Sequence, residues 1–253
     1  KLQSGKLFKI IEIHKFLPHK ILKNLTLGFD PNLFTSRQLK IYFKDLLKLK
    51  SINENLIDSI CPPKKYKTKS FFSIKDKIVG QNYKLKINKI IKILKKYKSD
   101  YLFVSAPENV AWILNIRGSD NPYSPIPNCR LLIGKNNQIF LITEKEKILK
   151  IIKDKKLNKK QIINPKKFEN LIKNLKGSKF IIDSFTCSLL NENIIKSKFI
   201  IINKNDPCYK LKSIKNSSEI KHMINAHLED GLALTKFIYW IKNQKKKKIT
   251  EIS

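Results

Sequence analysis

The fold is decided by the stretch from Ser105 to Pro125, which reads SAPENVAWILNIRGSDNPYSP. It opens with serine, a favoured N-cap residue, and continues with a proline and a glutamate in what would be a first helical turn. Apolar residues spaced three and four apart follow at Val110, Ile113 and Leu114. The pattern predicts a short buried helix with Ser105 as its N-cap and an end near Asn115.

The second half of the stretch has the composition of a turn. Arg117-Gly118-Ser119-Asp120 is followed by prolines at positions 122, 125 and 127. Gly118 is free to take a positive φ, and the side chain of Asp120 can bond to its own backbone. From these residues alone we expect a loop held by an ion pair between Arg117 and Asp120.

Patterns typical of helices and strands alternate around this stretch. Leu85–Lys98 predicts an amphipathic helix and Tyr101–Val104 a buried strand, while Arg130–Ile133 and Gln138–Leu141 flank a turn and predict a hairpin. Further helices are expected near residues 145–153, 166–175 and 184–190, and strands at 161–164, 179–182 and 199–203. This alternation predicts an α/β fold with helices packed on a largely parallel or mixed sheet.

The N-terminal part predicts a second, smaller α/β unit. Leu7–Ile13 and Leu25–Asp30 have strand patterns, and a short helix is expected at Pro18–Asn24 between them. Thr35 and Gln38 form a capping box for a helix expected to run through Leu49. The charged, proline-containing segment around residues 61–67 predicts an interdomain linker.

The net charge of +33 over 253 residues invites a nucleic-acid-binding interpretation. Only three of the 53 basic residues are arginine, at positions 37, 117 and 130, although nucleic-acid sites draw on arginine for bidentate contacts. Lysine, isoleucine and asparagine are abundant from end to end, which the codon bias of an AT-rich genome explains. We therefore expect salt-sensitive, non-specific attraction to polyanions and no specific nucleic-acid partner.

The cysteines and the apolar runs bear on the cellular compartment. The four cysteines, at positions 61, 129, 187 and 208, have no metal-ligand spacing and are expected to be reduced thiols. Lysine interrupts every apolar run before it reaches membrane-spanning length, so no membrane span and no secretion signal is expected. The lysine run at 245–248 is interpreted as a solvated helix end.

The stretch Ser105–Pro125, with Trp112 in its apolar run and Asn-Ile-Arg-Gly-Ser-Asp after it, resembles the middle domain of aminopeptidase P, the long, three-domain type of Xaa-Pro aminopeptidase. A second stretch, Leu211–Gly231, is similar to the entry of the pita-bread catalytic domain of that family and reads LKSIKNSSEIKHMINAHLEDG. The resemblance implies two creatinase N-terminal-like domains, with mixed sheets flanked by helices, plus the first long helix of a pita-bread domain. The implied boundaries are 1–62 for the latter part of the first domain, 63–73 for a linker, 74–205 for the second domain and 206–253 for a truncated catalytic domain.

The resemblance also implies a function, for a parent protein longer than this chain. The family hydrolyses the bond between an N-terminal residue and a following proline, using water activated by two divalent metal ions, typically manganese. Its metal ligands are two aspartates, a histidine and two glutamates, all expected beyond Ser253, so this chain alone is expected to bind no metal and to be inactive. The implied parent is a cytoplasmic homodimer. Trp112, Arg117 and Asp120 are implied to support the interface with the catalytic domain.

The C-terminal helix has a mostly apolar stripe, which predicts that it packs firmly on another element. The stripe consists of residues 220, 223, 224, 227, 231, 234, 238 and 241. His227 lies on it and is interpreted as a hydrogen-bonded core residue rather than a metal ligand, because a ligand needs several converging partners. His222 is expected to face solvent.

Two alternatives from other classes stay open. A pita-bread homologue that has lost its metal ligands would act as a peptide- or protein-binding module, and the sequence past Ser253 would decide this. A lysine-rich nucleic-acid-binding protein would need saturable binding that survives moderate salt.

Overall fold

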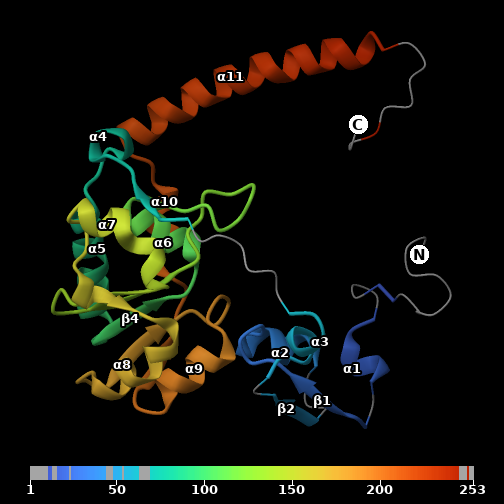
Figure 1. The fold of residues 1–253 in the computed structure, drawn as a ribbon, viewed down its shortest axis with the longest axis vertical. Helices are drawn as coiled ribbons and strands as arrows, with labels where there is room; N and C mark the ends of the chain where they lie inside the picture. The colour runs from blue at the N-terminus through green and yellow to red at the C-terminus, as the bar shows by residue number, and fades with distance from the viewer. Residues whose placement is uncertain are drawn as a thin grey trace.

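The computed structural model describes residues 11–12, 16–22, 24–43, 48–52, 54–62, 69–244 and 250. A small N-terminal unit lies beside a larger second unit, from which one long helix, α11, extends (Figure 1). The lysine run 245–248 and most of the predicted strand Leu7–Ile13 lie outside the described residues. None of the described helices is both long and apolar enough to cross a membrane.

The described residues of the N-terminal unit form two parallel strands and three short helices. Its elements are α1 (Pro18–Ile21), β1 (Thr26–Phe29), α2 (Ser36–Tyr42), β2 (Lys48–Ser51) and α3 (Leu56–Ile60). The capping box of Thr35 and Gln38 is confirmed. The predicted extension of this helix through Leu49 is wrong. Leu49 lies in β2, opposite Leu27 of β1, where backbone groups pair by hydrogen bonds between the two strands.

The second unit is built on a six-stranded mixed sheet with the order β10-β9-β4-β6-β7-β8. The strands are β4 (Tyr101–Val104), β6 (Arg130–Gly134), β7 (Ile139–Ile142), β8 (Ile162–Ile163), β9 (Lys179–Ile182) and β10 (Ile200–Asn203). β4 runs parallel to β9 and antiparallel to β6, and β6 and β7 form the predicted hairpin. The α/β class and the mixed sheet expected from the sequence are confirmed.

Helices cover both faces of this sheet. The helices that pack on it include α5 (Tyr83–Lys96), α6 (Pro107–Leu114), α7 (Leu149–Lys153), α8 (Phe168–Asn174), α9 (Leu189–Lys196) and α10 (Pro207–Ser213), whereas α4 (Asp76–Val79) and α11 (Ser217–Lys242) have no buried residue. Short 3-10 turns at Lys145–Ile148, Lys159–Gln161 and Pro165–Lys167 connect them, and a small ribbon joins β3 (Phe72–Ser73) to β5 (Ile116–Arg117).

Alternation along β4 divides the core into two layers. Leu102 and Val104 pack in a cluster with apolar residues of α5, α6 and α10 on one face. Tyr101 and Phe103 pack with α8 and α9 on the other face. Because successive strand residues point to opposite faces, four consecutive buried residues place β4 in the middle of a three-layer structure.

Two boundary predictions are corrected. The helix expected at 184–190 begins only at Leu189, with Ser188 as its N-cap, because residues before it form a turn in which Asp183 accepts a hydrogen bond from the amide of Phe185. The predicted linker 63–73 ends earlier than expected. Phe71 is fully buried in the second unit and residues 72–73 pair with β5.

Among the described residues, the two units touch through backbone hydrogen bonds, a cation–π pair and the side chain of Leu189, which packs on the core of the first unit. The amide of Leu189 donates to the carbonyl of Phe34 at 2.8 Å. The guanidinium of Arg37 lies 3.6 Å from the centre of the Phe185 ring. These contacts join α2 and its entry to the start of α9.

Candidate functional site

The helix at the centre of the candidate site, α6, differs from the prediction at its start and agrees at its end. Ala106 is the N-cap and Pro107 the first helical residue. Ser105, predicted as the N-cap, instead pairs its hydroxyl with that of Thr186 at 2.6 Å, so a contact from a distant segment replaces the local cap. Asn115 ends the helix in the left-handed conformation with φ of 51°.

Asn115 is the hub of a buried hydrogen-bond network at this helix end. Its Nδ2 donates to the carbonyl of Gln81 at 2.8 Å and to Asp76 Oδ1 at 3.4 Å, and its Oδ1 accepts from Lys86 Nζ at 2.7 Å. Its backbone carbonyl accepts from Lys156 Nζ at 3.0 Å. One asparagine thus ties α6 to α4, α5 and the segment after α7.

Lys86 is a buried lysine that the sequence analysis missed. It is 1% exposed, and its ammonium donates to the carbonyl of Trp112 at 2.8 Å as well as to Asn115. It takes part in none of the ion pairs found in the described part of the chain. The available signal was its position four residues before Ile90, on the apolar stripe of α5.

Burial has a direct effect on the charge of Lys86. It lowers the pKa of this lysine to about 8, and the positive charges of Arg117 and Lys156 add to the decrease, whereas Glu219 and Asp76 oppose it. The cause is desolvation, which disfavours the charged form of an amine. The ammonium is held by neutral oxygens and by an aromatic ring rather than by a paired carboxylate.

Trp112 supplies that ring. The Lys86 ammonium lies 4.2 Å from the ring centre, a distance at which cation–π attraction is effective. Trp112 is half-buried, and its buried Nε1 has no hydrogen-bond partner within the described structure. Trp112 therefore binds the lysine twice, because its ring lies against the ammonium and its backbone carbonyl accepts a hydrogen bond from it.

The expected ion pair between Arg117 and Asp120 is not formed. Arg117 Nη1 donates to its neighbour's carbonyl at Ile116, 2.9 Å away, and to that of Ala111 at 3.4 Å. Burial lowers the pKa of this guanidinium. Arg117 therefore adds a hydrogen bond to the Ala111 carbonyl in the last turn of α6, which also accepts the amide of Asn115, and a second one to the carbonyl of Ile116 in β5.

Asp120 instead binds Lys147, 2.9 Å away, and accepts a hydrogen bond from the amide of Asn128 at 2.6 Å. The second contact closes the proline-rich loop at its base. Gly118 does not adopt the positive φ that glycine is free to take. It is needed for close approach, since a Cβ at this position would lie 2.7 Å from Pro127 Cα.

The network continues to the start of α11. Gly80 ends α4 with φ of 71°, and Asn216 Nδ2 donates to the carbonyl of Val79 at 2.9 Å. Asn216 also forms an N-terminal capping box with Glu219. The Lys86–Asn115 pair, with the Trp112 ring beside it, is thus linked through Asp76 and Val79 of α4 to the start of α11, while Asp120 anchors a separate loop.

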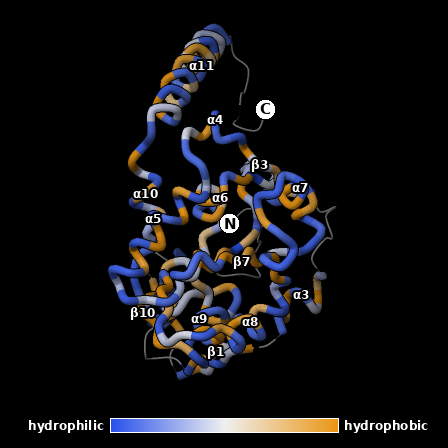
Figure 2. The backbone as a smooth tube through the Cα atoms, turned by 90° about the vertical axis from the view of Figure 1, so that its left-hand side faces the viewer, coloured by the Kyte–Doolittle hydropathy of each residue, from blue (hydrophilic) through white to orange (hydrophobic). Residues whose placement is uncertain are grey.

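Beyond its first turns, α11 is exposed on all sides, and none of its described residues is buried (Figure 2). The predicted apolar stripe exists, but nothing in the described part of the chain covers it. His227 is consequently exposed rather than a core residue, and His222 faces solvent as expected. Tyr123, at the tip of the proline-rich loop, is 99% exposed.

The residues present do not fit a dinuclear metal centre. Among the described residues, no three His, Cys, Asp or Glu side chains come together in a way that could hold a metal ion. Cys129, Cys187 and Cys208 are buried free thiols whose pKa is raised by burial, so they are inert packing residues rather than thiolate ligands. We therefore derive no metal-dependent step from this part of the chain.

The three-layer second unit and its loop define a known class of domain. The family model of the creatinase/prolidase N-terminal domain matches residues 62–219, and the chain belongs to this family.

The individual relatives have more specific names than the family model. The chain is similar to Xaa-Pro aminopeptidase 1 of Dictyostelium discoideum, with 30% identity over 95% of this chain and 40% of the relative. It is 29% identical to Xaa-Pro aminopeptidase ApepP of Drosophila melanogaster, over 92% of this chain and 39% of the relative. The fold matches X-prolyl aminopeptidase from Caenorhabditis elegans, described as a cytosolic enzyme with a di-nuclear active site, with a TM-score of 0.73 and 22% identity over 94% of this chain and 40% of that chain. The chain thus spans about two fifths of the length of these relatives.

Proposed function

We propose that this chain is part of a longer Xaa-Pro aminopeptidase, a metallopeptidase that hydrolyses the bond between an N-terminal residue and a following proline. The supporting observation is the similarity to an Xaa-Pro aminopeptidase along 95% of the chain, which includes both α6 with its loop and the start of α11. Its substrates would be peptides with proline at the second position. The parent would be a cytoplasmic homodimer.

In this proposal the chemistry lies in the part of the relatives that this chain does not match. Two divalent metal ions, manganese being our expectation, would supply an activated water there. The residues of this chain would have a supporting task. Trp112 and Arg117 would hold the end of α6 against the base of α11, and Asp120 would fix the loop that carries Tyr123.

The chain of 253 residues alone would then be inactive. The test compares this purified chain with the product of a longer stretch of the same reading frame, using an Arg-Pro-Pro peptide with and without Mn²⁺. We expect the longer product alone to release arginine, and only with the metal. Metal-dependent release by the 253-residue chain would contradict the assignment of the chemistry to the missing part.

The reading frame past Ser253 offers a second test. We expect the series Asp, Asp, His, Glu, Glu that the family uses as metal ligands. A frame that continues into a pita-bread domain without these residues would contradict the peptidase proposal and favour a binding module.

A further inference from the structure

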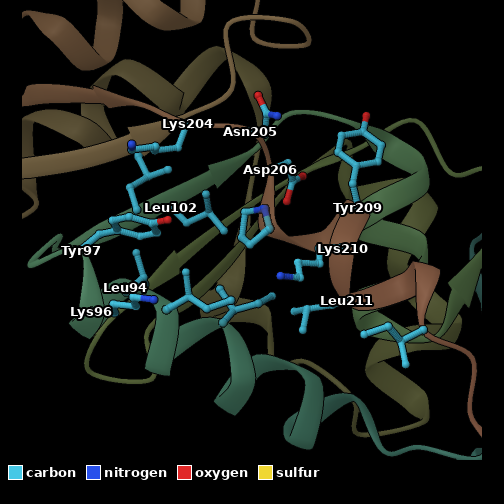
Figure 3. Close-up of a pocket in the computed structure, with 15 residues that line it drawn as sticks. Leu94, Lys96, Tyr97, Leu102, Lys204, Asn205, Asp206, Tyr209, Lys210 and Leu211 are labelled. Atoms are coloured by element: carbon cyan, nitrogen blue, oxygen red, sulfur yellow. The ribbon is translucent and has the colours of Figure 1, made fainter.

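A pocket with a volume of about 550 Å³ opens between α5, the loop after β10 and α10 (Figure 3). This is within the size range of small-molecule sites in proteins. Trp112, Arg117 and Asp120 do not line it, so the pocket is separate from the site described above.

The floor of the pocket is apolar. It consists of the partly exposed Ile93 of α5 and Leu211 of α10, together with Ile90 and Leu94 of α5, Leu102 of β4 and Ile181 of β9, which are at most 2% exposed. None of these side chains offers a hydrogen-bond donor or acceptor. The inner part of an occupant must therefore be apolar as well, because a polar group placed there would lose its bonds to water.

The rim carries three lysines. Lys204 and Tyr97 lie on one side of the opening and Lys210 and Leu211 on the other, while Lys96 projects from the end of α5 (Figure 3). In the described part of the chain, none of these three lysines belongs to an ion pair. Their charges face a shared opening without a compensating anion.

The single carboxylate among the lining residues does not neutralise this rim. Asp206 is 3% exposed, and its oxygens accept hydrogen bonds from the amide of Cys208 at 2.9 Å and from Asn109 Nδ2 at 2.7 Å. Burial is the main cause that raises its pKa. Its bonds run into the protein to α6 and α10, so the lysine rim stays free for an external anion.

We propose that this pocket binds a small amphiphilic acid, a molecule with one apolar chain and one anionic head group. The chain would lie over the floor formed by α5, β4 and β9. The head group would lie at the opening, among the ammonium groups of Lys96, Lys204 and Lys210. A carboxylate and a phosphate head group both carry the negative charge that complements these three lysines.

The test is a calorimetric titration of the 253-residue chain with decanoate, decyl phosphate and decan-1-ol. We expect saturable binding of one equivalent of either anion at this site, and comparison of the two anions identifies the preferred head group. In the double variant Lys204→Gln/Lys210→Gln, we expect about five- to ten-fold weaker binding of the anions and unchanged binding of the alcohol.

Two further variants distinguish binding at this pocket from non-specific effects of charge and from binding elsewhere on the chain. Lys150→Gln/Lys167→Gln removes the same charge from exposed positions away from the pocket and should leave the affinity unchanged. Ile93→Trp fills the pocket from α5 and should abolish the anion-dependent site, while any binding to the exposed α11 persists. Equal weakening by both lysine pairs, or anion binding that neither Ile93→Trp nor the rim variant reduces, would refute the proposal.

Discussion

The buried ammonium of Lys86 gives the structure a measurable pH dependence. We consider the substitution Lys86→Met, which keeps much of the side-chain volume and removes the charge. In the folded chain the pKa of Lys86 is lowered to about 8 by burial, from a normal value of 10.5. Between these two pH values the unfolded chain therefore binds more protons than the folded chain.

The direction in which stability changes with pH follows from this difference in proton binding. The free energy of unfolding must increase as the pH rises from about 8 towards 10.5, because the folded state no longer holds an unfavourable buried charge. Below pH 8 the penalty is fully present. The difference between the two pKa values corresponds to at most about 3 kcal/mol. Partial screening by solvent reduces the expected gain to about 2 kcal/mol.

The assay is urea unfolding followed by circular dichroism at several pH values between 7 and 10, for the unaltered chain and for Lys86→Met. Tyr83 and Tyr101, whose pKa values are raised by burial, are present in both proteins, so their contributions cancel in the difference. We expect the two free energies to diverge by about 2 kcal/mol over this range, with the gain confined to the unaltered chain.

A matched control is Lys89→Met, which removes an exposed lysine from the same helix and should follow the unaltered chain at every pH. The reasoning would be wrong if the Lys86→Met curve ran parallel to that of the unaltered chain within about 0.5 kcal/mol. The same conclusion would follow if Lys89→Met produced an equal divergence.

Further predictions concern the loop and α11. Gly118→Ala places a Cβ 2.7 Å from Pro127 Cα and should lower the free energy of unfolding by about 1–3 kcal/mol. In Gly231→Ala the added Cβ meets no atom within 4 Å, and alanine favours a helix, so this change should be neutral or stabilise by up to about 1 kcal/mol. Thermal unfolding measures both effects. Asp120→Asn removes the ion pair with Lys147 but keeps an acceptor for the loop, so we expect faster proteolysis within the loop and a loss of about 1 kcal/mol. Without α11 the chain should be monomeric, whereas the full chain should self-associate through the uncovered stripe as its concentration rises; light scattering that finds both monomeric would contradict this.

Sequence reasoning succeeded where periodicity and burial agree. The apolar spacing in α5 and the apolar run in β4 each describe an element whose structure follows from which face is buried, and both were located within about two residues. The capping box at Thr35 succeeded because its two hydrogen bonds are local.

It failed where a distant segment supplies the partner. Asp120 binds Lys147 rather than its near neighbour Arg117, and the hydroxyl of Ser105 binds Thr186 rather than capping α6. Lys86 was missed for the same reason, since its acceptors lie on α6 and no local pattern indicates that they converge. Long-range pairing of polar groups is decided by packing, which hydrophobic periodicity does not describe.

The attachment of α11 at one end makes the position of its far end sensitive to the geometry at its start. The helix is 26 residues long, or about 39 Å, and among the described residues the hydrogen bond that joins it to α4 runs from its N-cap, Asn216, to Val79 beside Gly80. A tilt of about 10° at this pivot would displace the far end of the helix by about 7 Å, given that length. Small differences in the geometry of one glycine-terminated turn are thus amplified into the placement of whatever follows α11 in the chain.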